Sequence, residues 1–362
     1  MAAQHIAIIY GGKSTEHEVS IRSARNIAKA IDKTKYSLSL IAIAKDGSWY
    51  SKSMEELNSE NVVLPTIKRL SLIPGGNRGM LMNLETNTEL ASLDAVFPIV
   101  HGTSGEDGTL QGLLKTMNIP FVGPGVIGSA LCIDKEVAKR MLNEAGIANS
   151  KFLSYHKSQR NQITYEKAQA ALGTPMYVKP PNLGSSVGIS KVTTKREFDV
   201  AIDEAFKYDR KVLIEQNIVG REIECAVLGN ADVKASPVGE VVTNQESHTF
   251  YDYAAKYTDA NGSVTMIPAD LDTETQNRIQ TIAEKTYKTL NCEGMARVDV
   301  FVTETGEIIV NEVNTLPGFT DISMYPKLWE AGGISYSDLI TKLIELAIER
   351  SEDEDKMQTS VY

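Results

Sequence analysis

Hydrophobic residues are spaced along the chain in two ways, one typical of buried strands and the other of amphipathic helices. Short apolar runs at 6–10, 38–44 and 95–100 predict buried strands, and apolar residues at helical spacing over 21–31 predict a helix between the first two. Strands that alternate with helices indicate an open α/β sheet, whose ligands bind at the carboxyl ends of its strands. Two glycine-containing loops follow predicted strand ends, at residues 11–12 and 101–108.

The alternation continues after Pro124-Gly125, which predicts a domain boundary there. Residues 51–92 are polar and irregular, and we expect them to be excursions at the edge of the first domain. The later pattern predicts helices at 134–144, 195–207 and 335–349, strands at 176–178 and 212–215, and a hairpin at 296–313. The expected units are an N-terminal α/β domain at 1–123, a central domain at 124–215, a C-terminal domain at 216–350 and a disordered acidic tail at 351–362.

Composition excludes several classes of protein. The 362 residues are 42% hydrophobic, enough for a large core, and the net charge of -10 gives no sign of the basic face that nucleic-acid binding requires. No apolar stretch reaches the roughly 18 residues of a membrane helix, and Ile6–Tyr10 is too short for a signal peptide. Three widely separated cysteines and the lack of CxxC and HExxH motifs argue against a disulfide framework and a zinc site. We therefore expect a cytoplasmic protein that binds neither nucleic acid nor a membrane.

The loop after the first strand, Gly11-Gly12-Lys13-Ser14, resembles the end of a phosphate-binding P-loop. The complete motif needs a glycine where this chain has Ala7, and the later glycines of a dinucleotide-binding motif are also missing. A tight turn into a helix remains, with Glu16 and Glu18 near the helix start. Glutamates there either complement the helix dipole or hold a substrate ammonium group, and the residues alone leave both readings open.

A second loop has a stronger signal for a phosphate site. Lys179 ends a predicted buried strand, and the glycine- and serine-rich segment 182–188 follows it. Backbone N–H groups and hydroxyls of such a loop can surround phosphate oxygens, and the lysine can neutralise their charge. The alternative is an ordinary hairpin turn, but lysine is rare in a buried strand, which favours phosphate.

The hairpin at 296–313 predicts a cation site. If residues 305–306 form a two-residue turn, the opposed pairs are Asp299 with Glu312 and Arg297 with Asn314. Opposed side chains are about 5 Å apart, so two acids there ask for a cation, and oxygen ligands select magnesium or manganese. A bulged turn would instead place Asn311 opposite Asp299, and a solvent-facing edge hairpin is the alternative reading.

Two further segments complete the set of candidates. The strand at 212–215 ends in polar residues, where Glu215 and Glu222 could contact a nucleobase or ribose hydroxyls, although an ordinary strand end explains them equally well. The aromatic segment Phe250–Tyr257 lies in a long polar loop at 243–263. Long loops are usually functional or disordered, and the aromatic residues favour a closing lid that excludes water.

Together these segments resemble the D-alanine–D-alanine ligases of the ATP-grasp superfamily, over residues 5–350. The resemblance rests on six motifs in order: GGKSTEHEVS, HGTSGEDGTLQG, KPPNLGSSVGIS, FYDYAAKY, ARVDVF and NEVNTLPGFT. It implies three α/β domains, of which the first is an open parallel sheet that binds substrate and the other two hold ATP between them. It also implies that a cytoplasmic homodimer joins two D-alanines through a D-alanyl phosphate for peptidoglycan synthesis, with ATP and two Mg²⁺ or Mn²⁺ ions.

The resemblance assigns roles to the matching residues. Those that match ATP ligands are Lys135, Lys179, Ser185, Ser186, Glu215, Gln216, Ile218, Glu222 and Lys256. Those that match contacts to the two D-alanines are Glu16, His101, Arg297, Gly318, Ser323 and Met324. The matches to metal ligands are Asp299, Glu312 and Asn314. In the implied mechanism Arg297 and the Gly318 N–H stabilise an oxyanion, and the catalytic triad that closes the lid is Glu16, Ser185 and Tyr257. Gln216 departs from the lysine often found in relatives.

Three other functions share much of this pattern. A D-alanine–D-lactate ligase would replace the lid tyrosine or carry a lid histidine, so Tyr257 favours the dipeptide while His248 keeps the alternative open. Another ATP-grasp carboxylate–amine ligase is a more distant alternative. An inactive nucleotide-binding relative would be expected to lack metal ligands or the oxyanion arginine, and this chain keeps both.

Overall fold

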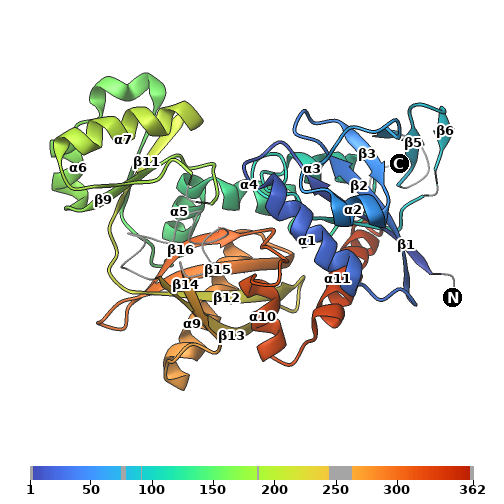
Figure 1. Cartoon of the computed structure of the whole chain (residues 1–362). Helices are drawn as coiled ribbons and strands as arrows, with labels where there is room; N and C mark the ends of the chain where they lie inside the picture. The colour runs from blue at the N-terminus through green and yellow to red at the C-terminus, as the bar shows by residue number, and fades with distance from the viewer. Residues whose placement is uncertain (1–2, 75–78, 91, 186, 244–262, 359–362) are drawn as a thin grey trace.

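The structure, a computed structural model, describes residues 3–74, 79–90, 92–185, 187–243 and 263–358. Their strands form two four-stranded sheets, one five-stranded sheet and one three-stranded sheet, with helices packed around them (Figure 1). No helix in these ranges is both long enough and apolar enough to cross a membrane.

The first sheet is the open, mainly parallel sheet that the sequence predicts. Its elements are β1 (Gln4–Gly11), α1 (His17–Ala30), β2 (Tyr36–Ile43), β3 (Trp49–Lys52), β7 (Ala95–Pro98) and α3 (Thr109–Thr116). The strand order is β3-β2-β1-β7, with β1 parallel to both β2 and β7. Gly11 ends β1 with φ +90°, and a Cβ there would lie 2.3 Å from the carbonyl oxygen of Ile43. Only glycine therefore allows the tight turn into α1.

Residues 51–92 are more ordered than predicted. They form α2 (Met54–Ser59), β4 (Leu70–Leu72), β5 (Leu81–Asn83) and β6 (Thr88–Glu89), and the last three make the antiparallel three-stranded sheet. A capping box between Ser53 and Glu56 begins α2. These elements are too short to show a hydrophobic period, which is why the sequence pattern did not predict them.

The second four-stranded sheet forms a lobe apart from the five-stranded sheet (Figure 1). Its elements are β8 (Phe152–His156), the 3-10 helix at Lys157–Gln162, α6 (Tyr165–Leu172), β9 (Met176–Lys179), β10 (Ser190–Val192), α7 (Lys195–Tyr208) and β11 (Lys211–Gln216). The strands are antiparallel in the order β10-β9-β11-β8. Val178 and Ile214 pack in a core with α6 and α7. Because side chains alternate along a strand, Lys179 and Glu215 point to the opposite face.

The five-stranded sheet is antiparallel, in the order β14-β13-β12-β15-β16. Its strands are β12 (Arg221–Gly229), β13 (Lys234–Thr243), β14 (Ser263–Met266), β15 (Gly294–Val302) and β16 (Ile308–Asn314), and its helices are α4 (Val126–Ile133), α5 (Lys135–Glu144), α9 (Thr273–Thr289) and α10 (Met324–Ala331). Val298 and Val300 share a core with α9 and also with Cys132 of α4 and Leu142 of α5. Helix α5 therefore packs on this sheet, although the expected boundaries assign it to the central unit.

The last helix, α11 (Tyr336–Asp355), corrects the prediction of a disordered tail, which is wrong for residues 351–355. Arg350 anchors this end of the helix by donating to the carbonyl oxygens of Gly123 (2.7 Å) and Phe121 (2.8 Å). Its apolar residues, including Leu339 and Leu343, share a core with the first sheet. The helix therefore ties the end of the chain to the N-terminal sheet, and this long-range packing is invisible in the acidic composition of the tail.

Candidate active site

The candidate cation site lies on β15 and β16, where Asp299 stands opposite Glu312, which confirms the predicted pairing. The predicted two-residue turn is wrong, because Thr303 N–H donates to Glu307 O (3.0 Å) and leaves a three-residue turn between them. This turn shifts the register by one residue, and a bulge at Asn311 shifts it back before Glu312. The longer turn and the bulge shift the register in opposite directions, so together they restore the predicted pair.

Arg297 organises the acidic face of this hairpin. Its Nε and Nη2 donate to the two carboxylate oxygens of Asp299, both at 2.7 Å, and its Nε lies 2.9 Å from Glu224 Oε2. Asn314 Nδ2 also donates to Asp299 Oδ2 (2.9 Å). Glu224, Asp299 and Glu312 stand side by side on β12, β15 and β16. Like charges in adjacent strand positions repel, so this face favours cations.

Lys135, the first residue of α5, is a second cation at this face. Its Nζ lies 3.3 Å from Glu312 Oε2 and donates to Leu183 O (2.9 Å). Among the described residues, three carboxylates therefore meet two cationic side chains, which leaves a net negative charge. Over the same residues no His, Cys, Asp and Glu side chains gather in threes as a preformed metal site. The carboxylate and amide oxygens are nevertheless hard donors that fit Mg²⁺ or Mn²⁺ when phosphate oxygens complete the shell.

A second charged cluster lies at the ends of β9 and β11. Glu215 is 4% exposed, its Oε1 lies 2.8 Å from Lys139 Nζ, and its Oε2 pairs with Lys179 Nζ. Lys139 Nζ also donates to Ser150 Oγ (2.8 Å). Burial opposes ionisation of Glu215, but the charges of Lys139 and Lys179 outweigh it and lower the pKa of Glu215 to about 2. Two lysines against one carboxylate give this cluster a net positive charge.

The Glu215 carboxylate, expected at the adenine or ribose, is bound by those two lysines, and its contact with the nucleotide stays a prediction. Gln216, the last residue of β11, and Ile218, in the link from β11 to β12, are half-buried. Glu222, near the start of β12, lies close enough to Tyr177 of β9 to affect it: burial and then the charge of Glu222 raise the pKa of Tyr177. These candidate nucleotide residues therefore lie where the two sheets meet.

The glycine- and serine-rich loop after β9 reaches the first sheet. Ser185 has φ +51° and donates from its Oγ to Glu16 Oε1. Glu16 is buried, and a Cβ added to Gly102 or Gly184 would lie 3.1 or 3.3 Å from its Oε2. The structure thus brings together two members of the predicted triad. Several expectations lie outside the described residues: Ser186, His248, Lys256, Tyr257 and the lid at 250–257.

The loop that follows β16 is held by residues of α1 and of the loop after β7. Leu316 N–H donates to Glu106 Oε1 (3.1 Å), and Leu316 O lies 3.0 Å from His101 Nδ1. Phe319 N–H donates to Ser23 Oγ (3.1 Å), which lies 3.3 Å from His101 Nε2. Burial lowers the pKa of His101, so the ring is neutral at physiological pH. His101, expected beside the first substrate, therefore holds this loop in place.

Gly318 and Ser323, two predicted substrate contacts, lie next to each other in the same loop. A Cβ on Gly318 would lie 2.7 Å from Ser323 Oγ, and Ser323 Oγ also accepts from Thr320 N–H (2.9 Å). Met324 begins α10, and its side chain is buried in the core against Gly239. The Met324 side chain therefore serves packing.

Glu106 is a residue of this site that the sequence analysis missed. Its Oε2 accepts from Gly102 N–H (2.7 Å). Burial and then the charge of Glu16 raise the pKa of Glu106 to about 8. At neutral pH the uncharged form of this carboxyl is therefore favoured. The available signal was an acid inside the glycine-rich loop at 101–108, at the end of a predicted strand.

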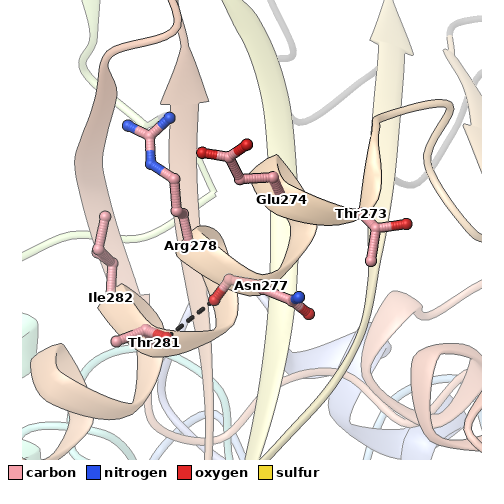
Figure 2. Close-up of a pocket in the computed structure, with 6 residues that line it drawn as sticks. All are labelled: Thr273, Glu274, Asn277, Arg278, Thr281 and Ile282. Atoms are coloured by element: carbon pink, nitrogen blue, oxygen red, sulfur yellow. Dashed lines mark hydrogen bonds between the residues drawn. The ribbon is translucent and has the colours of Figure 1, made fainter.

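A surface pocket of about 570 Å³ lies elsewhere, on α9 (Figure 2). It is lined by Thr273, Glu274, Asn277, Arg278, Thr281 and Ile282. Helix α9 covers the face of the five-stranded sheet that carries Val298 and Val300. Arg297 and Asp299 alternate with these valines and point to the other face, so the pocket is separate from the candidate site.

Comparison with known proteins gives consistent matches over the chain. The family model for the D-ala D-ala ligase N-terminus matches residues 5–124, and that for the D-ala D-ala ligase C-terminus matches residues 141–345. The D-alanine–D-alanine ligase of Shouchella clausii is 53% identical over 100% of this chain and 99% of that protein. D-alanine–D-alanine ligase A of Salmonella typhimurium is 47% identical over 100% of both chains.

Solved structures of related ligases have the same fold over nearly the whole chain. The D-alanine-D-alanine ligase from Coxiella burnetii has a TM-score of 0.86 at 38% identity, covering 98% of this chain and 97% of that chain. The VanG D-Ala:D-Ser ligase from Enterococcus faecalis has a TM-score of 0.84 at 37% identity, covering 95% of this chain and 99% of that chain.

Proposed function

The chain belongs to the D-alanine–D-alanine ligase family, and we propose that it uses ATP to join two D-alanine molecules into D-alanyl-D-alanine. The dipeptide is a building block of bacterial peptidoglycan, and we place its synthesis in the cytoplasm. Family membership implies the use of ATP and of metal ions. We propose that the metal is Mg²⁺ or Mn²⁺, with two ions bound, and that the enzyme is a homodimer.

The proposed reaction has two steps. A carboxylate oxygen of the first D-alanine attacks the γ-phosphorus of ATP, the bond to the β–γ bridging oxygen breaks, and ADP leaves. The neutral amine of the second D-alanine then attacks the carbonyl carbon of the acyl phosphate, inorganic phosphate leaves, and the amine loses a proton. Water would hydrolyse the acyl phosphate, so the site must exclude it.

The two charged clusters divide the nucleotide between them in this proposal. Lys135 and Lys179, with the loop at 182–188, bind phosphate oxygens. Asp299, Glu312 and Asn314 would hold the metal ions, which would supply positive charge to offset that of the phosphoryl group.

The remaining candidates bind the amino acids. Glu16, whose carboxylate accepts a hydrogen bond from Ser185, binds the ammonium group of the first D-alanine. Arg297 and the N–H of Gly318 stabilise the oxyanion that forms when the amine attacks. Ser323 lies beside Gly318 and is assigned to the second D-alanine.

One observation supports this proposal most strongly: α5 lies between two clusters of opposite net charge. Lys135 contacts the acidic hairpin cluster, and Lys139, four residues later on the same helix, contacts the basic cluster. A metal–nucleotide complex has the same division, with cations on one side and phosphate oxygens on the other. The two clusters are therefore complementary to it.

The test is ATP-dependent phosphate release with D-alanine, L-alanine, or D-alanine with D-lactate or D-serine as second substrate, and with the product identified by mass. The proposal predicts D-alanyl-D-alanine as the main product, formed in step with phosphate. D-Lactate tests the depsipeptide alternative, and D-serine is included because a D-Ala:D-Ser ligase shares the fold. A mainly D-alanyl-D-lactate or D-alanyl-D-serine product at neutral pH would replace the dipeptide assignment.

A further inference from the structure

Two lysines on α5 have different environments although they are one helical turn apart. Lys135 lies against the acidic hairpin, through Glu312. Lys139 is 1% exposed, and its Nζ is bound by Glu215 Oε1 and Ser150 Oγ, each at 2.8 Å. Lys139 is thus held on the inner side of the basic cluster, while Lys179 binds the other carboxylate oxygen of Glu215.

Nucleotide binding weakens one of the two ion pairs that hold Glu215 in the basic cluster. In the proposed function Lys179 contacts phosphate oxygens, so its bond to Glu215 must weaken or break. Glu215 is 4% exposed, so water cannot replace the lost ion pair by hydrating the carboxylate. A buried carboxylate that loses its cation is strongly disfavoured and tends to take up a proton. Lys139 is placed to prevent this, because its own contacts do not involve the loop that wraps phosphate.

We propose that Lys139 is a positioning residue that keeps Glu215 ionised and in place while Lys179 transfers from Glu215 to the phosphates of ATP. The inference rests on the proposed function and deepens it. It assigns the surplus positive charge of the cluster to the nucleotide, since the pair Lys139–Glu215 is neutral by itself. The charged groups that face Glu215 in the described part of the chain are Lys139 from α5 and Lys179 from β9, with Lys135 acting on Lys139 from the preceding turn.

The first variant is Lys139→Met, which keeps the length of the side chain and removes the charge. Glu215 then has Lys179 as its partner, and a nucleotide must strand a buried carboxylate to bind that lysine. Isothermal titration with adenylyl imidodiphosphate, a non-hydrolysable ATP analogue, should show binding about 10- to 100-fold weaker than in wild type at pH 8. The loss should shrink toward pH 6, because protonation of Glu215 removes the stranded charge.

Proton uptake provides a readout that a purely structural role of Lys139 would not change. Titrations in two buffers with different heats of ionisation give the number of protons taken up on binding. Lys139→Met should take up as much as about one proton more than wild type. Binding with the wild-type affinity, or weaker binding with the wild-type proton count and pH dependence, would overturn the proposal.

The double variant Lys139→Met/Glu215→Gln keeps the test valid if the single variant does not fold. It removes both members of the buried pair, which proteins usually tolerate better than the loss of one. With no carboxylate to strand, Lys179 is available, and the affinity should return to within about tenfold of wild type, with no extra proton uptake. A double variant that binds more than about 100-fold more weakly than wild type would show that charge balance is not the role of Lys139.

A matched control removes a lysine from an exposed ion pair. Lys195 pairs with Glu166 at 3.2 Å, and both side chains are largely exposed, so Lys195→Met should bind the analogue like wild type. The wild-type titration distinguishes failure of the proposed function from failure of the role proposed for Lys139. If wild-type protein neither binds the analogue nor ligates D-alanine, the proposed function fails. If it does both and the Lys139 variants behave like the control, only this inference fails.

Discussion

The acidic cluster on β15 and β16 and the basic cluster on β9 and β11 differ in the sign of their excess charge. Both hold ionised groups close together, and in each one sign is in excess among the side chains named above. At the hairpin, carboxylates outnumber the cations Arg297 and Lys135. At the other cluster, two lysines share Glu215.

The difference lies in what each cluster still needs. A buried group of charges is most stable when it is neutral, so a net negative cluster favours a cation and a net positive cluster favours an anion. Helix α5 contacts both through Lys135 and Lys139, so a ligand that has both signs can complete the two together. The two clusters therefore favour ligand groups of opposite charge, and the contribution of each cluster can be removed by its own substitution.

Removing a charge from the acidic cluster should have the largest effect. Glu312→Gln keeps the shape of the side chain but weakens metal binding, and turnover should fall by about 100-fold or more, with part of it restored at high Mg²⁺. Steady-state phosphate release over a range of Mg²⁺ concentrations measures this. Glu307→Gln, an exposed position on the same hairpin, is the control and should keep wild-type turnover. Near-normal activity of Glu312→Gln would remove it from the metal site.

The basic cluster is broken by Lys179→Met, with a different kinetic signature. Loss of a lysine that binds phosphate should raise the KM for ATP by about 10- to 100-fold. The KM for D-alanine should change much less, because the amino-acid candidates lie on other elements. Initial rates with each substrate varied in turn separate the two constants. An unchanged KM for ATP would mean that Lys179 serves only to pair with Glu215.

Acid titration sharpens the account of Glu215. Its pKa in the folded protein, about 2, is below the 4.5 of an unperturbed glutamate, so its stabilising effect is present above pH 4.5 and is lost as the pH falls toward 2. A shift of this size corresponds to about 3 kcal/mol. Between pH 4.5 and 2 the free energy of unfolding should therefore fall less in Lys139→Met/Glu215→Gln than in wild type, as measured by urea denaturation. Parallel curves would show that Glu215 does not titrate as the ion pairs imply.

The smallest effect is expected from an ion pair that looks similar but lies at the surface. Lys115 and Glu354 are 3.0 Å apart, with side chains 57% and 44% exposed. Lys115→Ala should change the free energy of unfolding by less than about 0.5 kcal/mol and leave turnover unchanged. A loss as large as that in the buried clusters would mean that the end of α11 depends on this contact and that burial does not decide how much such an ion pair stabilises the fold.

The sequence predicted the first sheet well, because that sheet follows from local periodicity. The facing of Asp299 and Glu312 was also predicted, but from an assumed two-residue turn. Even there the mechanism differed, since the two-residue turn is absent and a bulge at Asn311 restores the register. Bulges depend on contacts with neighbouring strands, and a single strand's pattern of side chains does not show them.

The basic cluster was only half predicted. Lys139 has the spacing of an ordinary polar residue on an amphipathic helix, and its burial arises because α5 is placed against β11, far away in sequence. Glu106 and Glu224 were missed for the same reason: the first is recognised by its contact with Leu316, and the second by its place beside Asp299 on a neighbouring strand. Contacts of this kind depend on tertiary packing, which local propensity does not encode.

The most direct test of the central claim is the affinity of wild type and Glu312→Gln for adenylyl imidodiphosphate, measured with and without Mg²⁺. If the acidic cluster binds the cation of a metal–nucleotide complex and the basic cluster binds its phosphates, Mg²⁺ should tighten binding to wild type by about tenfold or more. Glu312→Gln should lose most of that gain while keeping its metal-free affinity. An equal Mg²⁺-dependent gain in both proteins would contradict the division of the nucleotide between the two clusters.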